Sequence, residues 1–251
     1  MILTEDQLKE RKDKARKEEI RQNVKSHCTK IRDGIRANGS TSGERAIWEL
    51  FQNARDLSDS AEIKITLTDK EFIFAHKGKA FTYDSLCSLV KQVSSHEKED
   101  NNSVGQYGTG FLTTHKFSRK ITINGSMLIS EEPKVYVDVT SFEINRENFN
   151  DIPKFIDDMT DQIESVEKLM DTEQKRTPKD WTELHYELNE ERHNIADKAI
   201  EEAIRMMPYV LTFNDNVSRC TICYKEQVIE FKKEDKATSI DNLRCKRITK
   251  S

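Results

Sequence analysis

The sequence predicts an α/β sandwich, a fold in which a β-sheet packs against a layer of helices. Strands with alternating apolar residues begin at residue 61, and amphipathic helices lie before and after them. Glycine-containing loops separate strands from helices at two places. A chain of 251 residues is long enough for one main domain with appendages.

The first two elements are helices. Residues 4–36 are helix-prone and dense in interleaved charges, which favours a solvated or partner-packed helix over a nucleic-acid-binding arm. The stretch N-G-S-T-S-G at 38–43 interrupts this pattern, and its Ser and Thr residues can cap the next helix. In that helix, Glu49, Asn53 and Asp56 form one polar stripe, away from an apolar stripe that contains Leu50 and Phe51.

Two strands and two loops follow. Alternation at 61–67 and an apolar run at 71–76 predict a hairpin joined by T-D-K-E. A glycine-containing loop leads to a helix at 83–93. The polar segment S-S-H-E-K-E-D-N-N-S at 94–103 is expected to be a mobile loop, and it runs into V-G-Q-Y-G-T-G-F.

The second half repeats this alternation of strands and helices. Strands are predicted at 120–125, 134–142 and 181–188, the last with Thr182 and Tyr186 on the same face. Helical periodicity runs from Ile152 to Leu169, with Pro178 expected to close the helix. A helix at 189–207 is expected to stop at Pro208, before strands at 209–213, 217–224 and 227–231.

These elements suggest three parts. The expected parts are a charged helical extension at 1–40, a main domain at 41–190 with a helical insertion at about 145–178, and a helix with strands at 191–251. The tail from Lys232 is polar, which leaves open whether it is disordered or begins a further domain.

Net charge and the length of apolar runs indicate which kinds of partner the protein can bind. Lys and Arg number 41 against 45 Asp and Glu, so the net charge of −4 provides no general attraction to nucleic acid or an acidic membrane. A nucleic-acid partner would need a local basic patch. No apolar run approaches the roughly 18 residues of a membrane span, and the first residues turn charged too early for a signal peptide. We therefore expect a cytoplasmic protein without a membrane partner.

The five cysteines are odd in number and scattered, which does not indicate a disulfide framework. Cys220 and Cys223 form a C-x-x-C pair, but no second pair or histidine pair lies at ligand spacing. We expect two small residues in a buried strand, with zinc as the alternative.

Glycines 105, 108 and 110 form the pattern G-x-x-G-x-G. Glycine lets backbone N–H groups approach an anion closely, and a helix that begins near Phe111 would add its dipole. Neither the P-loop pattern nor the strand-G-x-G-x-x-G-helix opening of dinucleotide-binding folds is present in the sequence.

Four motifs in this order, E-L-F-Q-N-A-R-D, H-K-G-K-A-F, V-G-Q-Y-G-T-G-F and T-E-L-H-Y-E-L, resemble the GHKL ATPase superfamily over about residues 44–188. The superfamily includes gyrase-type topoisomerases, a heat-shock chaperone, sensor histidine kinases and mismatch-repair ATPases. The resemblance implies a Bergerat-type ATP-binding fold, a two-layer sandwich whose mixed sheet is covered by helices on one face. ATP and Mg²⁺ are the implied ligands.

The resemblance also assigns roles along the first helix. Glu49, Asn53 and Asp56 match the N-box E-x-x-x-N-x-x-D. Glu49 would orient and deprotonate the attacking water, which is general-base chemistry. Asn53 would hold Mg²⁺ through its side-chain carbonyl, because this ion prefers oxygen ligands. Asp56 would support the pocket.

The other implied contacts lie in the later motifs. The phosphate cradle would be framed by the three glycines, with backbone contacts from Gln106 and Tyr107. Residues 94–104 would be a lid over ATP, and Thr182 would lie at the adenine end. The remaining implied nucleotide contacts are Gly78, Phe81, Ser94, Ser95, Lys98, Gly105, Gly108, Thr109, Gly110 and Phe111.

One departure from the family concerns adenine. Most members have D-x-G-x-G, whose Asp accepts the adenine amino group, whereas this chain has His76, Lys77 and Gly78 at that place. A neutral imidazole or a backbone carbonyl can accept the same hydrogen bond, so strict adenine preference stays open. His76 is alternatively a strand-end histidine packed on Phe81. The His-x-Gly-x-x-Phe form resembles a divergent bacterial branch with some defence-related members.

The leading hypothesis is an ATPase whose lid closure drives a change in association, such as a nucleotide-dependent homodimer. The alternative is a nucleotide-gated sensor with little turnover, because many relatives need a Lys or Arg from a following transducer domain, and 209–251 is short for one. A histidine kinase is disfavoured by Glu49 and by the context of His27, H-C-T-K. A scaffold with a degenerate pocket is the remaining alternative. The client protein is not predicted.

Overall fold

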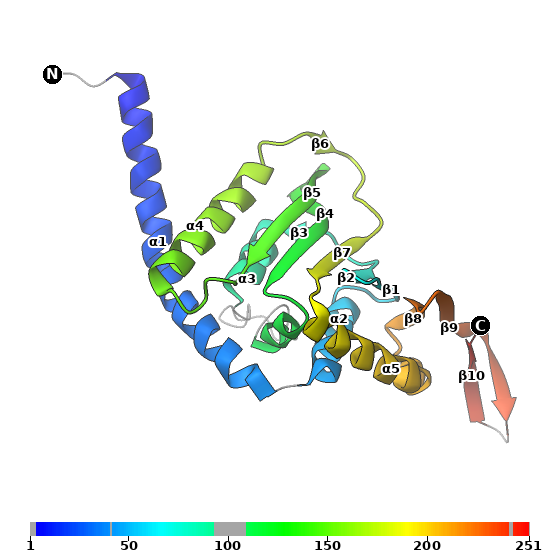
Figure 1. Ribbon diagram of the computed structural model, residues 1–251. Coiled ribbons are helices and arrows are strands. Elements are labelled where there is room, and N and C mark those ends of the chain that lie inside the picture. The colour runs from blue at the N-terminus through cyan, green and yellow to red at the C-terminus, as the bar shows by residue number, and fades with distance from the viewer. Residues whose placement is uncertain (1–3, 41, 93–108, 241–242, 251) are drawn as a thin grey trace.

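The computed structural model describes residues 4–40, 42–92, 109–240 and 243–250. It shows a mixed α/β arrangement in which helices lie against a large sheet (Figure 1). The helices are α1 (Glu5–Ala37), η1 (Asn38–Ser40), α2 (Gly43–Asp56), α3 (Tyr83–Lys91), η3 (Thr109–Lys116), α4 (Ile152–Leu169) and α5 (Glu190–Phe213). The strands are β1 (Ala61–Leu67), β2 (Glu71–His76), β3 (Phe81–Thr82), β4 (Lys120–Glu131), β5 (Lys134–Asn145), β6 (Gln174–Lys175), β7 (Thr182–Glu187), β8 (Val217–Tyr224), β9 (Gln227–Ile240) and β10 (Leu243–Lys250).

Among the described residues, the ten strands form a single mixed sheet. Its order is β10-β9-β8-β1-β2-β7-β4-β5-β6, with β3 beside β4. The β1–β8 and β3–β4 pairs are parallel, and the other pairs are antiparallel. The strands after α5 therefore extend the sheet that the earlier strands begin. The predicted domain boundaries stay predictions.

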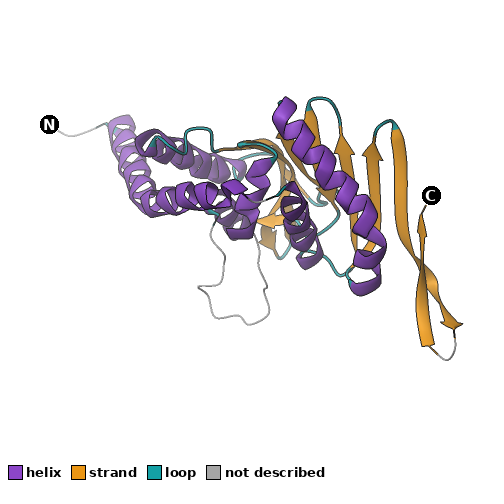
Figure 2. Cartoon of the chain, turned by 60° about the horizontal axis from the view of Figure 1, so that its bottom comes forward, coloured by secondary structure: helices purple, strands orange, loops and turns teal. Residues whose placement is uncertain are grey.

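The sheet has one apolar face and one polar face, because side chains alternate along each strand. Ile63, Phe74 and Leu184 are buried on the face that the helices cover. The cartoon view shows these helices gathered on that side (Figure 2). The core therefore lies between the helices and one side of the sheet, which confirms the predicted α/β class.

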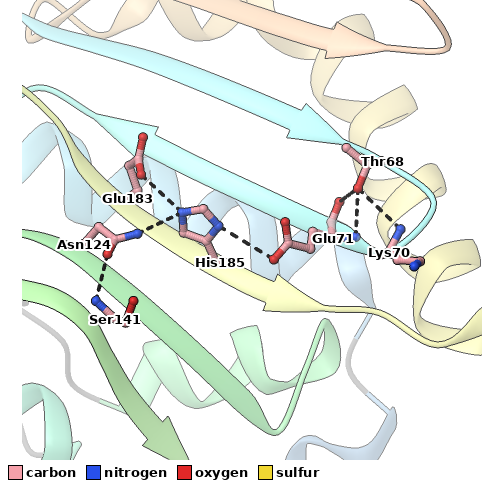
Figure 3. A network of polar contacts seen from close by, with 7 residues as sticks. All are labelled: Thr68, Lys70, Glu71, Asn124, Ser141, Glu183 and His185. Atoms are coloured by element: carbon pink, nitrogen blue, oxygen red, sulfur yellow. Dashed lines mark hydrogen bonds and ion pairs between the residues drawn. The ribbon is translucent and has the colours of Figure 1, made fainter.

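The opposite face carries a polar network that joins four neighbouring strands (Figure 3). His185 Nε2 on β7 lies 3.2 Å from a Glu183 carboxylate oxygen and 3.3 Å from Asn124 Nδ2 on β4. The Ser141 backbone N–H on β5 donates to Asn124 Oδ1 at 2.9 Å. His185 Nδ1 lies 3.9 Å from Glu71 on β2. Nε2 of His185 either donates to Glu183 or accepts from Asn124 Nδ2, so these two contacts are alternatives within one network.

The N-terminal extension is a helix, as predicted. Thr4 caps α1 with a reciprocal hydrogen-bond pair to Gln7. Val24, Cys28, Ile31 and Ile35 recur every three or four residues along the helix and are buried. Since α1 packs against α4, the second half of the charged helix has an intramolecular partner (Figure 1).

Two predicted helix ends were wrong. α4 ends at Leu169, well before Pro178. The residues that follow are exposed and do not continue the apolar stripe, and Gln174–Lys175 forms a short strand that pairs with β5. α5 continues through Pro208 to Phe213, so the predicted strand at 209–213 does not form. Met207 and Leu211 are fully buried, and their burial outweighs the hydrogen bond that proline removes.

The polar tail contains strand backbone. β9 continues to Ile240, beyond the predicted end at 231, and pairs with β10. Along the described residues, no helix is both long and apolar enough to span a membrane.

Candidate functional site

The polar stripe of α2 points into the molecule. Asn53 is only 8% exposed, and its Nδ2 has no hydrogen-bond partner among the described residues. The Asp56 side chain is 11% exposed; Arg55 donates to its Oδ1 at 2.7 and 2.9 Å, whereas the buried Oδ2 has no partner in the described structure. An exposed helix face would direct such groups to water, whereas here both polar atoms are buried without a partner among the described residues.

Glu49, the first residue of the stripe, lies against η3. A Cβ placed on Gly110 would lie only 2.1 Å from Glu49 Oε2. That separation is far below van der Waals contact, so glycine is required for this close approach. The structure thus brings the last glycine of the predicted phosphate motif beside the predicted general base. η3 is a 3₁₀ helix that begins at Thr109, slightly before the helix start expected near Phe111, which is fully buried.

His76 ends β2 near the C-terminal end of α2. It is 2% exposed, and burial lowers the pKa of His76 to about 4, against a smaller opposing effect of the Lys77 backbone. Its imidazole is therefore neutral at pH 7. Nδ1 is buried without a hydrogen-bond partner in the part of the chain that the structure describes. A Cβ on Gly78 would lie 3.2 Å from both His76 Nδ1 and Leu57 O, so the glycine loop closes tightly over these groups.

Thr182 lies directly beside His76. The two residues are register partners in the antiparallel β2–β7 pair, and Thr182 is buried. A Cβ on Gly125 of β4 would lie 3.2 Å from Thr182 Oγ1 and 3.7 Å from Phe81. Gly125 thus adjoins two predicted nucleotide contacts and was missed by the sequence analysis. The N-G pair inside an alternating strand is the signal that indicates such a close approach.

The described residues of the predicted site form two groups along α2. Glu49 and Gly110 lie together, and His76 and Gly78 lie by the end of the same helix, with Thr182 across from His76. Seven residues of α-helix span about 10 Å, which separates Glu49 from Asp56. The two groups therefore lie at opposite ends of the polar stripe of α2.

Several predicted contacts are not placed. Ser94, Ser95, Lys98, Gly105, Gln106, Tyr107 and Gly108 lie outside the described residues, and so does the expected lid at 94–104. Thr109 is the first residue of η3.

A hollow of about 750 Å³ lies on the polar face of the sheet, lined by residues that include Thr122 and His185. Several of its polar residues, among them Glu71, Ser141 and His185, take part in the network that Figure 3 shows. The unpartnered atoms of Asn53, Asp56 and His76 belong instead to α2 and the strand end beside it. We therefore place the candidate site at α2 rather than in this open hollow.

The C-x-x-C pair lies on β8. Cys220 is buried, and burial raises the pKa of its thiol, whereas Cys223 is half-buried. Residues three apart on a strand point to opposite faces, so the two thiols do not converge on one ion. Within the described ranges, no group of three or more His, Cys, Asp and Glu side chains could hold a metal.

No protein-family model matches the sequence, and comparison with curated proteins finds no significant match.

Proposed function

We propose that this protein binds ATP along α2 within a Bergerat-type fold and hydrolyses it with Mg²⁺. The observation that carries the proposal is the set of three buried polar atoms without hydrogen-bond partners in the described structure: Asn53 Nδ2, Asp56 Oδ2 and His76 Nδ1. Buried polar atoms are nearly always bonded, and leaving one unpaired costs about 1–3 kcal/mol. A polar ligand along α2 would supply the missing partners.

At the base end, the neutral ring of His76 accepts a hydrogen bond from the exocyclic amino group of adenine. Thr182 contributes a hydroxyl group from the adjacent strand. Glycine at position 78 avoids a Cβ that would lie 3.2 Å from Nδ1. These residues replace the charged acceptor of the family motif by a neutral one.

At the phosphate end, the Asn53 side-chain carbonyl offers an oxygen ligand to Mg²⁺, and its amide Nδ2 donates to a phosphate oxygen. The bound ion supplies charge neutralisation for the phosphates. η3 begins at Thr109, and its Gly110 lies beside Glu49, so N–H groups of its first turn would be available to the phosphates.

Glu49 accepts the proton of the attacking water. Its side chain is 21% exposed, so water reaches it, and its ion pair with Arg45 is long, at 3.8 Å. Because the carboxylate makes no tight ion pair with the described residues, it is available as a general base. Hydrolysis of the γ-phosphate then depends on how well Glu49 is positioned.

The second candidate function is a nucleotide-gated sensor with little turnover. It is favoured by the cations of β8 and β9 whose partners the structure gives: Arg219 pairs with Glu62 and Glu230, and Lys233 pairs with Asp215. Lys233 also donates to the Asn214 carbonyl and is thus engaged by a group other than Glu49, whereas the Arg219 pairs, at 4.0 and 3.6 Å, are about as long as the Arg45–Glu49 pair. The lid closure and the nucleotide-dependent homodimer stay predictions for either function.

Calorimetric titration with ATP, ADP and GTP in the presence of Mg²⁺ tests the pocket, and phosphate release tests turnover. We expect Glu49→Ala to keep ATP binding and to lower turnover by about 100-fold or more. Asn53→Ala should weaken Mg²⁺-dependent binding. Gln52→Ala, on the exposed side of α2, serves as the control.

Absence of binding at millimolar nucleotide would refute the pocket. Binding without turnover, unchanged by Glu49→Ala, would favour the sensor.

A further inference from the structure

Glu49 is bounded on one side by η3. A Cβ on Gly110 would lie 2.1 Å from Glu49 Oε2 and 2.7 Å from Cδ, so the Gly110 backbone is in direct contact with the carboxylate. Arg45 restrains Glu49 little, because it is 64% exposed and its nearest atom is 3.8 Å away. The placement of η3 therefore controls where the carboxylate can lie.

The other end of η3 is fixed by His115, which is 1% exposed. His115 Nδ1 lies 3.1 Å from the carbonyl oxygen of Ser118, and Nε2 lies 2.7 Å from Nε2 of Gln92. Since a carbonyl only accepts, Nδ1 carries the proton. Burial lowers the pKa of His115 well below its usual range, with a further contribution from Arg146. The ring is therefore neutral, and Gln92 donates to Nε2.

Gln92 is a buried residue with a left-handed backbone conformation. It caps α3 with a φ of 48°, in the left-handed region that residues with a Cβ seldom adopt, and it is 4% exposed. Two residues earlier, the carbonyl of Val90 accepts a hydrogen bond from the buried Arg146. The Oε1 atom of Gln92 has no hydrogen-bond partner in the described part of the chain. The bond to His115 thus links the end of α3 to η3.

η3 transmits this link over five residues. The Thr113 hydroxyl donates to the Gly110 carbonyl at 2.8 Å, and the Thr114 hydroxyl donates to the Phe111 carbonyl at 2.8 Å. Gly110 and His115 thus belong to one short, internally bonded helix. We therefore expect a shift of His115 to move Gly110 as well.

We propose that Gln92 is a positioning residue for Glu49, acting through His115 and Gly110. This inference rests on the proposed hydrolysis by Glu49. Gln92 holds η3 against the carboxylate, so that Glu49 is placed for the water it activates.

Gln92→Met tests this role, because methionine has a similar length but no amide donor. We expect kcat to fall about tenfold, with KM for ATP and the affinity for a non-hydrolysable ATP analogue unchanged. Combined with Glu49→Ala, the substitution should cause no further loss of kcat, because both changes act on the same group. Gly110 amide and Glu49 carboxylate chemical shifts, measured by NMR, should also move in Gln92→Met.

Thr160→Val is the matched control. It removes a different buried hydrogen bond, from the Thr160 hydroxyl to the Ile156 carbonyl at 2.7 Å on α4. We expect it to lower the melting temperature while leaving kcat and the Gly110 and Glu49 signals unchanged.

Three results would overturn the positioning role. The first is that Gln92→Met lowers kcat by the same factor in the wild type and in Glu49→Ala. The others are an unchanged kcat in Gln92→Met and NMR signals of Gly110 and Glu49 that do not move. A wild-type protein that binds ATP without hydrolysis, while those signals move in Gln92→Met, would overturn the proposed hydrolysis and support the structural link.

Discussion

A methyl group added at Gly110 would occupy the space that the Glu49 carboxylate now fills. In Gly110→Ala, the added Cβ would lie 2.1 Å from Oε2, so the carboxylate must move. Because that atom is the end of a flexible side chain, we expect little change in stability but a fall in ATP hydrolysis of about tenfold or more. Phosphate release and thermal unfolding measure the two effects.

Gly39→Ala is the control for this substitution, since a Cβ there would have nothing within 4 Å. If Gly110→Ala hydrolyses ATP as fast as the wild type, Glu49 is not the general base or does not depend on this contact.

His76 makes stability depend on pH. Its pKa in the folded protein is about 4, below the value of about 6.5 for an unfolded chain, so the unfolded state binds a proton more readily. The contribution of His76 is complete above pH 6.5 and decreases as the pH falls toward 4, by about 3 kcal/mol in total. Urea unfolding between pH 4 and pH 7.5 should show this decrease.

His76→Gln should reduce that pH dependence without abolishing it, because the pKa of buried His115 is lowered as well. An identical slope in the wild type and in His76→Gln would show that His76 is not buried in its neutral form.

The positions of single residues were partly predictable from their spacing. Glu49, Asn53 and Asp56 share a stripe because four- and three-residue steps return to the same side of a helix. The Gln92–His115 bond and the approach of Gly125 to Thr182 could not be predicted in this way. Each joins segments that are distant in sequence, and neither leaves a periodic pattern.

A proline in the interior of α5 and a proline in the first turn of α4 should affect stability differently. Pro208 lies inside α5 and is exposed; it cannot donate to the carbonyl four residues earlier. We therefore expect Pro208→Ala to stabilise the protein by about 1–3 kcal/mol. Pro153 lies in the first turn of α4, where no such hydrogen bond exists, so Pro153→Ala should change stability little.

Equilibrium unfolding in urea compares the two variants directly. Equal effects of the two substitutions would contradict the assignment of Pro208 to the helix interior.

Elements were predictable where local pattern and tertiary packing agree. α2 and the β1–β2 hairpin follow from periodicities of 3.6 and 2, and the structure confirms both. The end of α5 was mispredicted because proline is a strong local signal for the end of a helix. The burial of Met207 and Leu211, which favours a longer helix, depends on residues that are distant in the sequence. The pairing of β8 with β1 is likewise a long-range contact that no local pattern specifies.

At the scale of the whole molecule, α1 is held by its apolar stripe more than by its charges. Ile31 is 1% exposed, so Ile31→Ala should destabilise the protein by about 3 kcal/mol. Arg16 pairs with Glu167 at 2.7 Å, but its side chain is 65% exposed, and Arg16→Ala should leave stability almost unchanged. Urea unfolding of both variants measures the difference; a larger loss in Arg16→Ala would mean that ion pairs hold the helix.

The pairing of distant segments also determines when the chain can fold during synthesis. Cys28 of α1 meets Met159 of α4 across 131 residues, and Ser218 of β8 bonds to Ala61 of β1 across 157 residues. At ribosomal rates of about 5–20 residues per second, α4 is synthesised on the order of 10 s after α1, and the apolar stripe of α1 cannot pack against it before then. During that time β1 keeps one hydrogen-bonding edge open, so a nascent chain exposes both an apolar helix and a strand edge that chaperones bind. High contact order of this kind makes folding slow even when the final structure is stable.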